Sequence, residues 1–156
     1  MRARNRLETY LSEHGVRWEL TPHVEAYTAQ EVAAAEHVPG GQVAKVVIAD
    51  VDGRRAMLVL AAPARVDLTR VRTVLRAKTV RLTREEEFAR MFPDCEVGAM
   101  PPFGNLYQVP VYLDRGLSEQ PRLIFNAGTH RETMTVAAAD FLRLVNPTVI
   151  DLAAAH

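Results

Sequence analysis

The chain of 156 residues contains 48% apolar and 24% charged residues, a composition typical of one soluble globular domain. Its 19 basic and 19 acidic side chains cancel, which excludes the global positive field of many dedicated nucleic-acid binders. One cysteine excludes an internal disulfide and a cysteine-based zinc site, and suits a reducing compartment. The charged N-terminus and the lack of a long apolar window indicate no secretory signal and no membrane span. We expect a cytoplasmic protein that forms a single domain over residues 1–156.

The first third of the chain predicts two helices and one short strand. Apolar residues recur at helical spacing from Leu7, so a helix is expected over residues 2–14. Residues 16–20 are typical of a short strand. Thr28-Ala29-Gln30-Glu31 is a capping box, in which the hydroxyl and the carboxylate each accept a hydrogen bond from an otherwise unpaired amide. It predicts a helix of about 10 residues that stops at Pro39.

The centre of the chain contains its strongest hairpin pattern. Asp52-Gly53 separates the apolar runs 43–50 and 56–61, and this dipeptide favours the tight turn that joins two antiparallel strands. Both runs are apolar on both faces, which predicts central strands of a sheet. After the hairpin, Asp67 is placed to cap a helix that continues through Arg76.

The second half of the chain alternates short strands and helices. A second capping-box pattern, Thr83-Arg84-Glu85-Glu86, predicts a helix that ends before Pro93, and Asp114-Arg115-Gly116 predicts a turn. Further elements are expected as strands at 79–82, 106–113, 123–125, 133–136 and 148–152 and as a helix at 138–144. The predicted fold is one α+β domain, with a mixed, mainly antiparallel sheet of about six to seven strands in a barrel-like wrap flanked by helices.

Lys45 is unusual because it interrupts an apolar strand. It lies between Val43 and Val47 on one face, and lysine is seldom fully buried without a partner. One interpretation is that its methylene stem packs against the sheet while the ammonium reaches the sheet edge. The other is that Lys45 is a cation at the wall of a pocket for a phosphate or a carboxylate.

A loop that runs from Gly98 to Gly104 combines permissive and rigid positions. Gly98, Ala99 and Met100 carry amide N–H groups beside the rigid pair Pro101-Pro102. Such a row of donors can hold a carbonyl, carboxylate or phosphate oxygen. The alternative is a tight connector between a helix and a strand.

The other reactive side chains give weaker signals. His130 lies in a polar, glycine-centred loop, where a histidine serves either as a scaffold residue or in chemistry. The five histidines show no metal-ligand spacing, so no metal site is expected. Cys95 has no recognisable nucleophile signature around it, which favours a small core residue. The chain contains no phosphate-binding glycine loop and no hydrolase elbow.

The stretch 65–84 is rich in basic residues. Seven of them face one acid, Asp67, and Arg72 and Arg76 lie four residues apart on one predicted helix face. This stretch is either a solvated surface balanced by the acids at 85–87 or a surface that contacts phosphates without reading bases.

Three segments together resemble one family. They are Ala44-Lys45 in a strand after a Pro-Gly-Gly turn, the loop Gly98–Gly104, and the loop Asn126-Ala127-Gly128-Thr129-His130-Arg131-Glu132. In this order and spacing they resemble the YbaK/ProX family, the free-standing relatives of the editing domain inserted in bacterial prolyl-tRNA synthetases. The resemblance extends from about Leu7 to Leu152.

The resemblance implies hydrolysis of mischarged aminoacyl-tRNA without a metal or other cofactor. Lys45 would contact the substrate near the terminal adenosine, and the amides of Gly98 and Ala99 would bind the ester carbonyl. The remaining implied substrate contacts are Met100, Pro101, Phe103, Gly104, Asn126, Gly128, Thr129 and His130, with Met100 and Phe103 as an apolar wall. Arg72 and Arg76 would contact the tRNA, and prolyl-tRNA synthetase is a candidate partner. An aminoacyl ester is already activated, so positioning and oxyanion stabilisation suffice, with water or a substrate group as nucleophile.

The sequence departs from the family pattern at two places. Val46 stands where the alanyl-editing branch places an asparagine, and Ala127–His130 replaces the Gly-Gly-Lys loop of the cysteinyl branch. The subfamily is therefore open, and the predicted substrate is a small amino acid (Ala, Cys, Ser or Thr), on proline tRNA. Two alternatives remain: a non-catalytic module that binds a nucleotide, tRNA or synthetase, and a hydrolase acting on another small ester.

Overall fold

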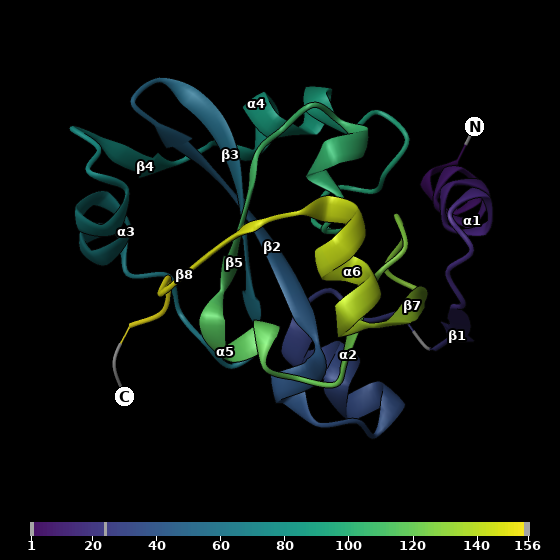
Figure 1. Cartoon of the computed structure of the whole chain (residues 1–156). Helices are drawn as coiled ribbons and strands as arrows, with labels where there is room; N and C mark the ends of the chain where they lie inside the picture. Colours follow the sequence, from purple (N-terminus) through teal and green to yellow (C-terminus); the bar gives the residue numbers. More distant parts are fainter. Residues whose placement is uncertain (1, 24, 155–156) are drawn as a thin grey trace.

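The computed structural model describes residues 2–23 and 25–154 as two sheets with helices around them (Figure 1). The helices are α1 (Ala3–Glu13), α2 (Ala29–Glu36), α3 (Leu68–Leu75), α4 (Glu85–Phe88), α5 (Arg115–Ser118) and α6 (Ala138–Val145). The strands are β1 (Glu19–Pro22), β2 (Ala44–Val51), β3 (Arg54–Ala61), β4 (Val80–Leu82), β5 (Val111–Asp114), β6 (Arg122–Asn126), β7 (Glu132–Ala137) and β8 (Thr148–Ile150). Short 3-10 turns occupy Gly40–Gln42, Ala89–Met91 and Gly104–Leu106. Within the described residues, no helix is long and apolar enough to cross a membrane.

The larger sheet has the strand order β4-β2-β3-β5-β8, and the smaller has the order β1-β7-β6. Strands β3, β5 and β8 run parallel to one another, and all other pairs are antiparallel. The predicted α+β class and mixed, mainly antiparallel pairing are confirmed. The expected single sheet of six to seven strands is replaced by two sheets that do not close into a barrel, with eight strands in the described residues.

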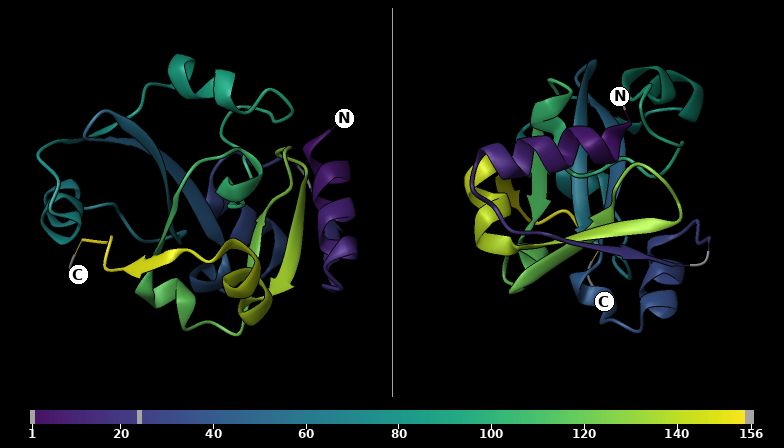
Figure 2. Two further views of the ribbon diagram at one scale, coloured as in Figure 1. Left: turned by 45° about the horizontal axis from the view of Figure 1, so that its top comes forward. Right: turned by 90° about the vertical axis from the view of Figure 1, so that its right-hand side faces the viewer.

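One apolar core joins the two sheets. It contains Met57 and Val59 from β3 and Phe125 from β6, and Leu7 of α1 and Phe141 of α6 add to it. Both views in Figure 2 show α1 lying beside the smaller sheet. The apolar face of α1 therefore holds this helix against the core, as expected for a helix with apolar residues at helical spacing.

The hairpin prediction is confirmed in its local geometry. Asp52 and Gly53 both have positive φ, of 50° and 83°, as the type I′ turn between β2 and β3 requires. The Asp52 carboxylate also accepts hydrogen bonds from the amides of Lys78 and Thr79, at 2.8 and 2.9 Å. The turn thus fixes the segment that leads from α3 to β4.

The two predicted capping boxes behave differently. The Thr28 hydroxyl accepts from the Glu31 amide at 3.0 Å, although the Glu31 carboxylate reaches the amide of Tyr27 rather than that of Thr28. The second capping box is wrong: Thr83 is buried, and its hydroxyl donates to Asp50 at 3.0 Å instead of capping α4. The buried Asp50 carboxylate needs this donor, so the tertiary contact outweighs the local motif.

Three other element boundaries differ from the prediction. The first strand lies at 19–22 instead of 16–20, and the expected strand 106–113 is confined to Val111–Asp114. The predicted turn at 114–116 is the start of α5. The predicted helices at 2–14 and 138–144 and the strands at 79–82, 123–125, 133–136 and 148–152 are confirmed within a few residues.

Candidate functional site

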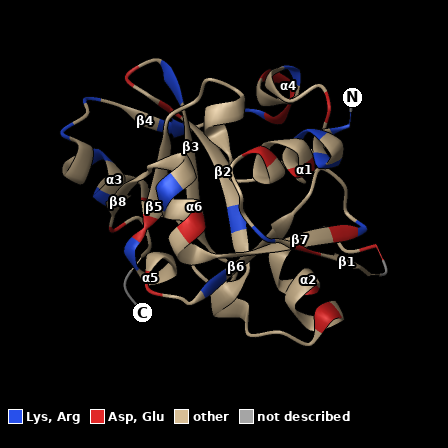
Figure 3. Ribbon diagram, turned by 45° about the vertical axis from the view of Figure 1, so that its right-hand side comes forward, with Lys and Arg blue, Asp and Glu red and all other residues tan. Residues whose placement is uncertain are grey.

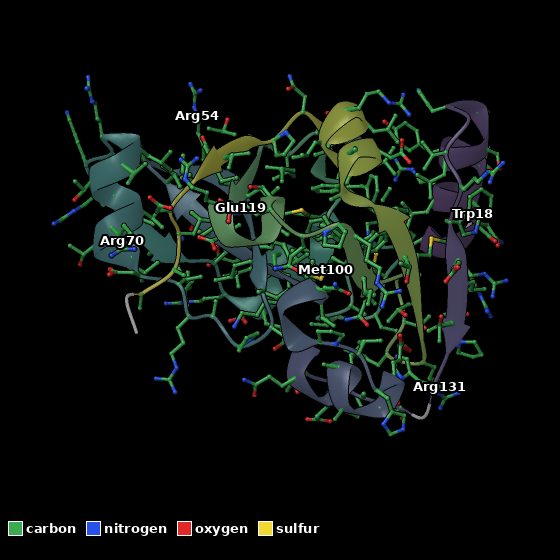
Figure 4. The ribbon with its side chains drawn as sticks, turned by 60° about the horizontal axis from the view of Figure 1, so that its bottom comes forward. Trp18, Arg54, Arg70, Met100, Glu119 and Arg131 are labelled. Carbon is green, nitrogen blue, oxygen red and sulfur yellow. The ribbon has the colours of Figure 1, made fainter. Side chains whose placement is uncertain are left out.

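A cleft of about 430 Å³ opens between β2, the end of β6 and the N-terminus of α2. It is lined by residues 27–30, 44–46, 62–65, Gly98, Met100 and Asn126. Figure 4 shows Met100 near the middle of the molecule, with Arg70 of α3 toward one end and Arg131 toward the other. The lining residues thus come from all three segments that the sequence predicted to form a site.

The cleft forms because the two sheets separate along one edge of β2. On this edge β4 pairs only with Ala49–Val51, and a bridge joins Val43 to Ile124 of β6. Between these contacts this edge of β2 has no strand partner among the described residues, although β3 pairs with the other edge. The gap leaves the start of β2 accessible beside Gly98 and Met100.

Lys45 lies in this gap. Its stem is half-buried, and its ammonium donates to the carbonyl of Ala64 at the cleft wall, whereas its binding of an anion stays a prediction. Burial, assisted by the nearby charge of Arg65, lowers the pKa of Lys45 below its usual value. The ammonium is thus held in place and incompletely solvated, which strengthens its attraction for an anionic group.

Two cleft residues of the predicted loop have backbone amides without a protein partner in the described part of the chain. Gly98 and Met100 line the cleft, and neither amide donates to an acceptor within the described part of the chain. Gly98 has φ of 85°, a conformation that glycine adopts without strain. These two N–H groups are suited to a carbonyl oxygen that gains negative charge.

The predicted donor Ala99 does not face the cleft. Its side chain is fully buried, its amide donates to the carbonyl of Glu96 at 3.0 Å, and its carbonyl accepts from Gly128. Because this N–H is already paired, Gly98 and Met100 replace Gly98 and Ala99 as the available pair.

The second half of the predicted loop belongs to the core. Phe103 is fully buried, with its ring centroid 5.3 Å from that of Phe125 and 5.4 Å from that of Phe141. A side chain at Gly104 would meet the Val109 carbonyl at 2.5 Å, so this glycine is required by packing. Pro101 is also buried. The structure thus assigns Pro101, Phe103 and Gly104 to packing, whereas Met100 remains in the cleft wall.

The predicted loop 126–130 divides between two sides of the molecule. Asn126 lines the cleft, and its side-chain Oδ1 is buried without a hydrogen-bond partner in the described residues. Gly128 and Thr129 instead line a separate hollow beside the N-terminus of α1. They lie outside the cleft, which the sequence spacing did not reveal.

His130 supports the cleft from behind. Its Nε2 lies 2.8 Å from the Val97 carbonyl, and its amide donates to the Glu96 carboxylate at 2.8 Å. A carbonyl only accepts, so Nε2 carries the proton. The peptide between Val97 and Gly98 is trans, so its N–H points opposite to the bonded carbonyl. His130 therefore orients the Gly98 amide, and Tyr27 stacks on the His130 ring at a centroid distance of 4.7 Å.

Gly128 fixes the contact between this loop and α1. Its φ is 97°, and an added Cβ would lie 2.6 Å from the Cβ of Ala3. We predict that Gly128→Ala lowers the free energy of unfolding by at least about 1 kcal/mol because of backbone strain, and further because of the clash. Urea denaturation measures this loss. Relative to the single variant Ala3→Gly, which has its own helix cost, the double variant Ala3→Gly/Gly128→Ala should show only the loss caused by strain. A stability equal to that of the wild type would contradict this packing role.

Two residues that the sequence prediction missed also line the cleft. Tyr27 is 60% exposed at its mouth, and Arg65 lies beside Lys45. Helix α2 is anchored by Glu36 at its end, which accepts from the buried hydroxyl of Thr133 at 2.7 Å. No local motif identifies these residues, because their roles depend on how α2 docks against β7.

Cys95 lies outside the cleft in a cluster that joins α1 to the loop. Its Sγ is 3.4 Å from the Tyr107 hydroxyl, which donates to Asp94 at 2.9 Å, and Arg6 lies over the Tyr107 ring. Burial raises the pKa of Cys95 to about 12. The thiol therefore stays protonated at neutral pH, which suits a packing residue rather than a nucleophile.

The raised pKa of Cys95 leads to a direct prediction. At pH 8 the native protein should react with iodoacetamide at least about tenfold more slowly than the protein unfolded in urea, because only the thiolate attacks. Mass spectrometry of samples quenched at intervals gives both rates, and a model thiol treated in the two solvents corrects for the effect of urea. Equal corrected rates would show that Cys95 is accessible and readily ionised.

Arg72 and Arg76 lie on a different part of the surface. Both are exposed, Arg72 on α3 and Arg76 at its C-terminal cap, and neither lines the cleft. Figure 3 shows basic residues on α3, at the opposite end of the molecule from α1. Arg81, from the same basic stretch, is instead paired with the buried Asp50.

Comparisons with known proteins identify the family of this chain. The aminoacyl-tRNA editing domain family matches residues 23–144. The Escherichia coli K12 protein named multifunctional Ser/Thr-tRNA deacylase ProXp-y is 25% identical over 151 residues, covering 94% of this chain and 90% of that protein. Its counterpart in E. coli O157:H7 matches equally.

Two solved structures share the fold. A candidate trans-editing enzyme for prolyl tRNA synthetase superposes with a TM-score of 0.83 at 23% identity, covering 98% of both chains. A hypothetical protein superposes with a TM-score of 0.85 at 19% identity, covering 96% of this chain and 99% of the other. The family match spans the cleft from Tyr27 to Asn126 and continues through α6. The chain belongs to the aminoacyl-tRNA editing domain family.

Proposed function

We propose that this protein is a trans-editing deacylase, which hydrolyses the ester bond between a small amino acid and a tRNA. The observation that carries the proposal is the convergence of the Lys45 ammonium and the unpaired amides of Gly98 and Met100 in one cleft. A volume of about 430 Å³ suits a small amino acid with part of a terminal nucleoside.

Each group has a distinct part in the proposed reaction. The Lys45 ammonium holds an anionic or polar group of the terminal nucleotide, and the Gly98 and Met100 amides bind the ester carbonyl oxygen. As a nucleophile adds to the ester carbon, the negative charge on this oxygen grows and the two N–H groups stabilise it. In one route water adds to the ester carbon and gives up a proton, while the ribose oxygen leaves and takes up a proton. In the other route a substrate hydroxyl displaces the ribose oxygen in the same way, and water then hydrolyses the ester so formed.

The amino acid is proposed to be Ala, Cys, Ser or Thr, carried on proline tRNA. The E. coli relative is named a Ser/Thr-tRNA deacylase, which favours Ser and Thr among these four. The decisive experiment incubates the protein with correctly and wrongly charged tRNAs and follows loss of the acyl group. Hydrolysis of a small-aminoacyl tRNA, with correctly charged prolyl-tRNA spared, supports the proposal. No hydrolysis across the panel would favour the alternative, a module that binds tRNA or prolyl-tRNA synthetase without catalysis.

The proposed tRNA contact of Arg72 and Arg76 has its own test. Each contact with a phosphate releases counterions, so the variant Arg72→Ala/Arg76→Ala should bind tRNA more weakly and with a salt slope shallower by about 1 to 2. Binding measured by fluorescence anisotropy at several salt concentrations gives the slope. The variant Arg17→Ala/Arg143→Ala removes the same charge from exposed positions after α1 and on α6 and serves as the control. An unchanged slope in the α3 variant would exclude this surface from tRNA binding.

A further inference from the structure

The open edge of β2 offers backbone hydrogen-bonding groups as well as the Lys45 side chain. Hydrogen bonds alternate along an antiparallel strand, so successive residues direct their N–H and C=O groups to opposite edges. The Val43 carbonyl accepts from Ala62, which follows β3, whereas the Ile48 carbonyl accepts from Thr83 on the other side. The N–H and C=O groups of odd-numbered residues in β2 therefore point toward β3, and those of even-numbered residues point toward the other edge.

Val46 is the even-numbered residue in the middle of the gap. Strand β4 reaches only Ala49–Val51, and the contact with β6 is the bridge at Val43. Both the N–H and the C=O of Val46 are thus directed to the open edge, and Val46 lines the cleft together with Gly98 and Asn126. No strand pairs with Val46 on this edge within residues 2–23 and 25–154.

The charges around the cleft restrict how an amino group can be held there. Its two charged lining residues, Lys45 and Arg65, are both cations, and the described residues of the lining include no carboxylate. A free α-ammonium must therefore be bound by a neutral acceptor. A backbone carbonyl at a strand edge is such an acceptor, and a bond to a charged donor is stronger than one between neutral groups.

We propose that the aminoacyl group of the substrate pairs with Val46 as if it were one residue of an added β-strand. Its α-ammonium donates to the Val46 carbonyl, and its acyl carbonyl accepts from the Val46 N–H, the pattern of a hydrogen-bonded antiparallel pair. The acyl oxygen has a second lone pair, which the Gly98 amide takes. The Met100 amide is the third donor, and it binds when the addition of the nucleophile turns this oxygen into an oxyanion with three lone pairs. This inference rests on the proposed deacylase function and adds the substrate class: α-aminoacyl esters with a free amino group.

The pairing makes the unmodified amino group a requirement. An N-acetylated aminoacyl-tRNA has lost the ammonium and carries a bulky group where the Val46 carbonyl would lie. We expect the N-acetylated forms of the small-aminoacyl tRNAs (Ala, Cys, Ser and Thr) to be hydrolysed about tenfold to a hundredfold more slowly than the free forms, after subtraction of the spontaneous rates.

The matching protein variant is Val46→Pro, which removes the outward N–H. Proline is tolerated where the missing N–H faces an open edge, so this variant should remain folded. Val47→Pro is the matched control, because the N–H of Val47 faces β3 and its loss breaks the ladder. Circular dichroism and thermal unfolding check the fold of both. Val46→Pro should lose about tenfold in kcat/KM on free aminoacyl-tRNA.

Comparison of the two changes separates lost pairing from general damage. Because N-acetylation and Val46→Pro disrupt the same pairing, their combined effect should be smaller than the product of the two single effects. Three outcomes would overturn the inference: equal wild-type rates on N-acetylated and free substrates, parental activity of a folded Val46→Pro variant, or a Val46→Pro variant whose rates on both substrates fall by the same factor. In each of these outcomes the wild type still deacylates free aminoacyl-tRNA, so the proposed function would stand. Failure of the wild type on every free aminoacyl-tRNA would instead overturn the proposed function.

Discussion

Replacing Lys45 with alanine should lower the rate of aminoacyl-tRNA deacylation by about a hundredfold or more while the protein stays folded. The ammonium holds a group of the terminal nucleotide, so without it the ester is misplaced against the Gly98 and Met100 amides, and a loss of positioning of this kind costs about a hundredfold in rate. The fold should tolerate the change because the side chain is only half-buried and its hydrogen-bond partner, the Ala64 carbonyl, lies at the accessible cleft wall. Single-turnover deacylation of a small-aminoacyl tRNA measures the effect.

The chain provides a matched control for Lys45. It contains two lysines, and the second, Lys78, is exposed on the segment between α3 and β4. Lys78→Ala should retain the parental rate, whereas Lys45→Met, which keeps most of the stem but not the charge, should be as slow as Lys45→Ala. If Lys45→Ala cleaves at the parental rate, Lys45 has no part in the reaction.

The lowered pKa of Lys45 predicts a pH dependence. Burial and Arg65 favour its neutral form, so the ammonium should lose its proton at a lower pH than a lysine in an unfolded peptide, and the enzyme-dependent rate should fall with it. The folded state binds this proton less tightly than the unfolded state, so the Lys45 contribution to stability increases as pH rises from the folded toward the unfolded pKa. NMR titration of the Lys45 side chain gives its pKa directly, and Arg65→Ala should raise this pKa. A Lys45 pKa equal to that of a lysine in an unfolded peptide would refute the prediction.

Removing the His130 side chain should slow deacylation by about tenfold to a hundredfold, mainly through kcat. The imidazole does not line the cleft, but its Nε2–H fixes the Val97 carbonyl and hence the direction of the Gly98 amide. Without it, that N–H no longer points stably at the ester oxygen, and a misplaced oxyanion donor loses most of its effect. Steady-state kinetics of His130→Ala measures kcat and KM separately.

Two further measurements distinguish orientation from simple loss of stability. His130→Gln retains an N–H donor near the Val97 carbonyl and should recover part of kcat, whereas His130→Leu fills the space without a donor and should not. The Gly98 amide signal in a ¹⁵N–¹H spectrum should shift in His130→Leu and return toward its wild-type position in His130→Gln. Equal activity of the glutamine and leucine variants, with an unmoved Gly98 signal, would contradict the orienting role.

Local sequence patterns determined much of the secondary structure. The Asp52-Gly53 turn was predictable because only residues that tolerate positive φ close such a hairpin. Asp67 caps α3 as expected, accepting from the Arg70 amide at 3.0 Å. The order and spacing of the Lys45 strand and the two glycine loops were also sufficient to identify the family. These features depend on residues close together in the chain, or on motifs that need no three-dimensional context.

The division of the predicted site between cleft and core depended on tertiary structure. In one loop Gly98 and Met100 face the cleft, whereas Ala99 is turned inward by hydrogen bonds and Phe103 is held among the rings of the core. Sequence spacing cannot distinguish these positions, because burial depends on which distant segment covers each side chain. The open edge at Val46 is likewise a property of the sheet, since β4 pairs with β2 only over Ala49–Val51 and β6 contacts this edge at Val43. The sequence by itself identified Lys45 and the two glycine loops as candidates for the chemistry, and the separation of two sheets decided which of their residues share a cleft.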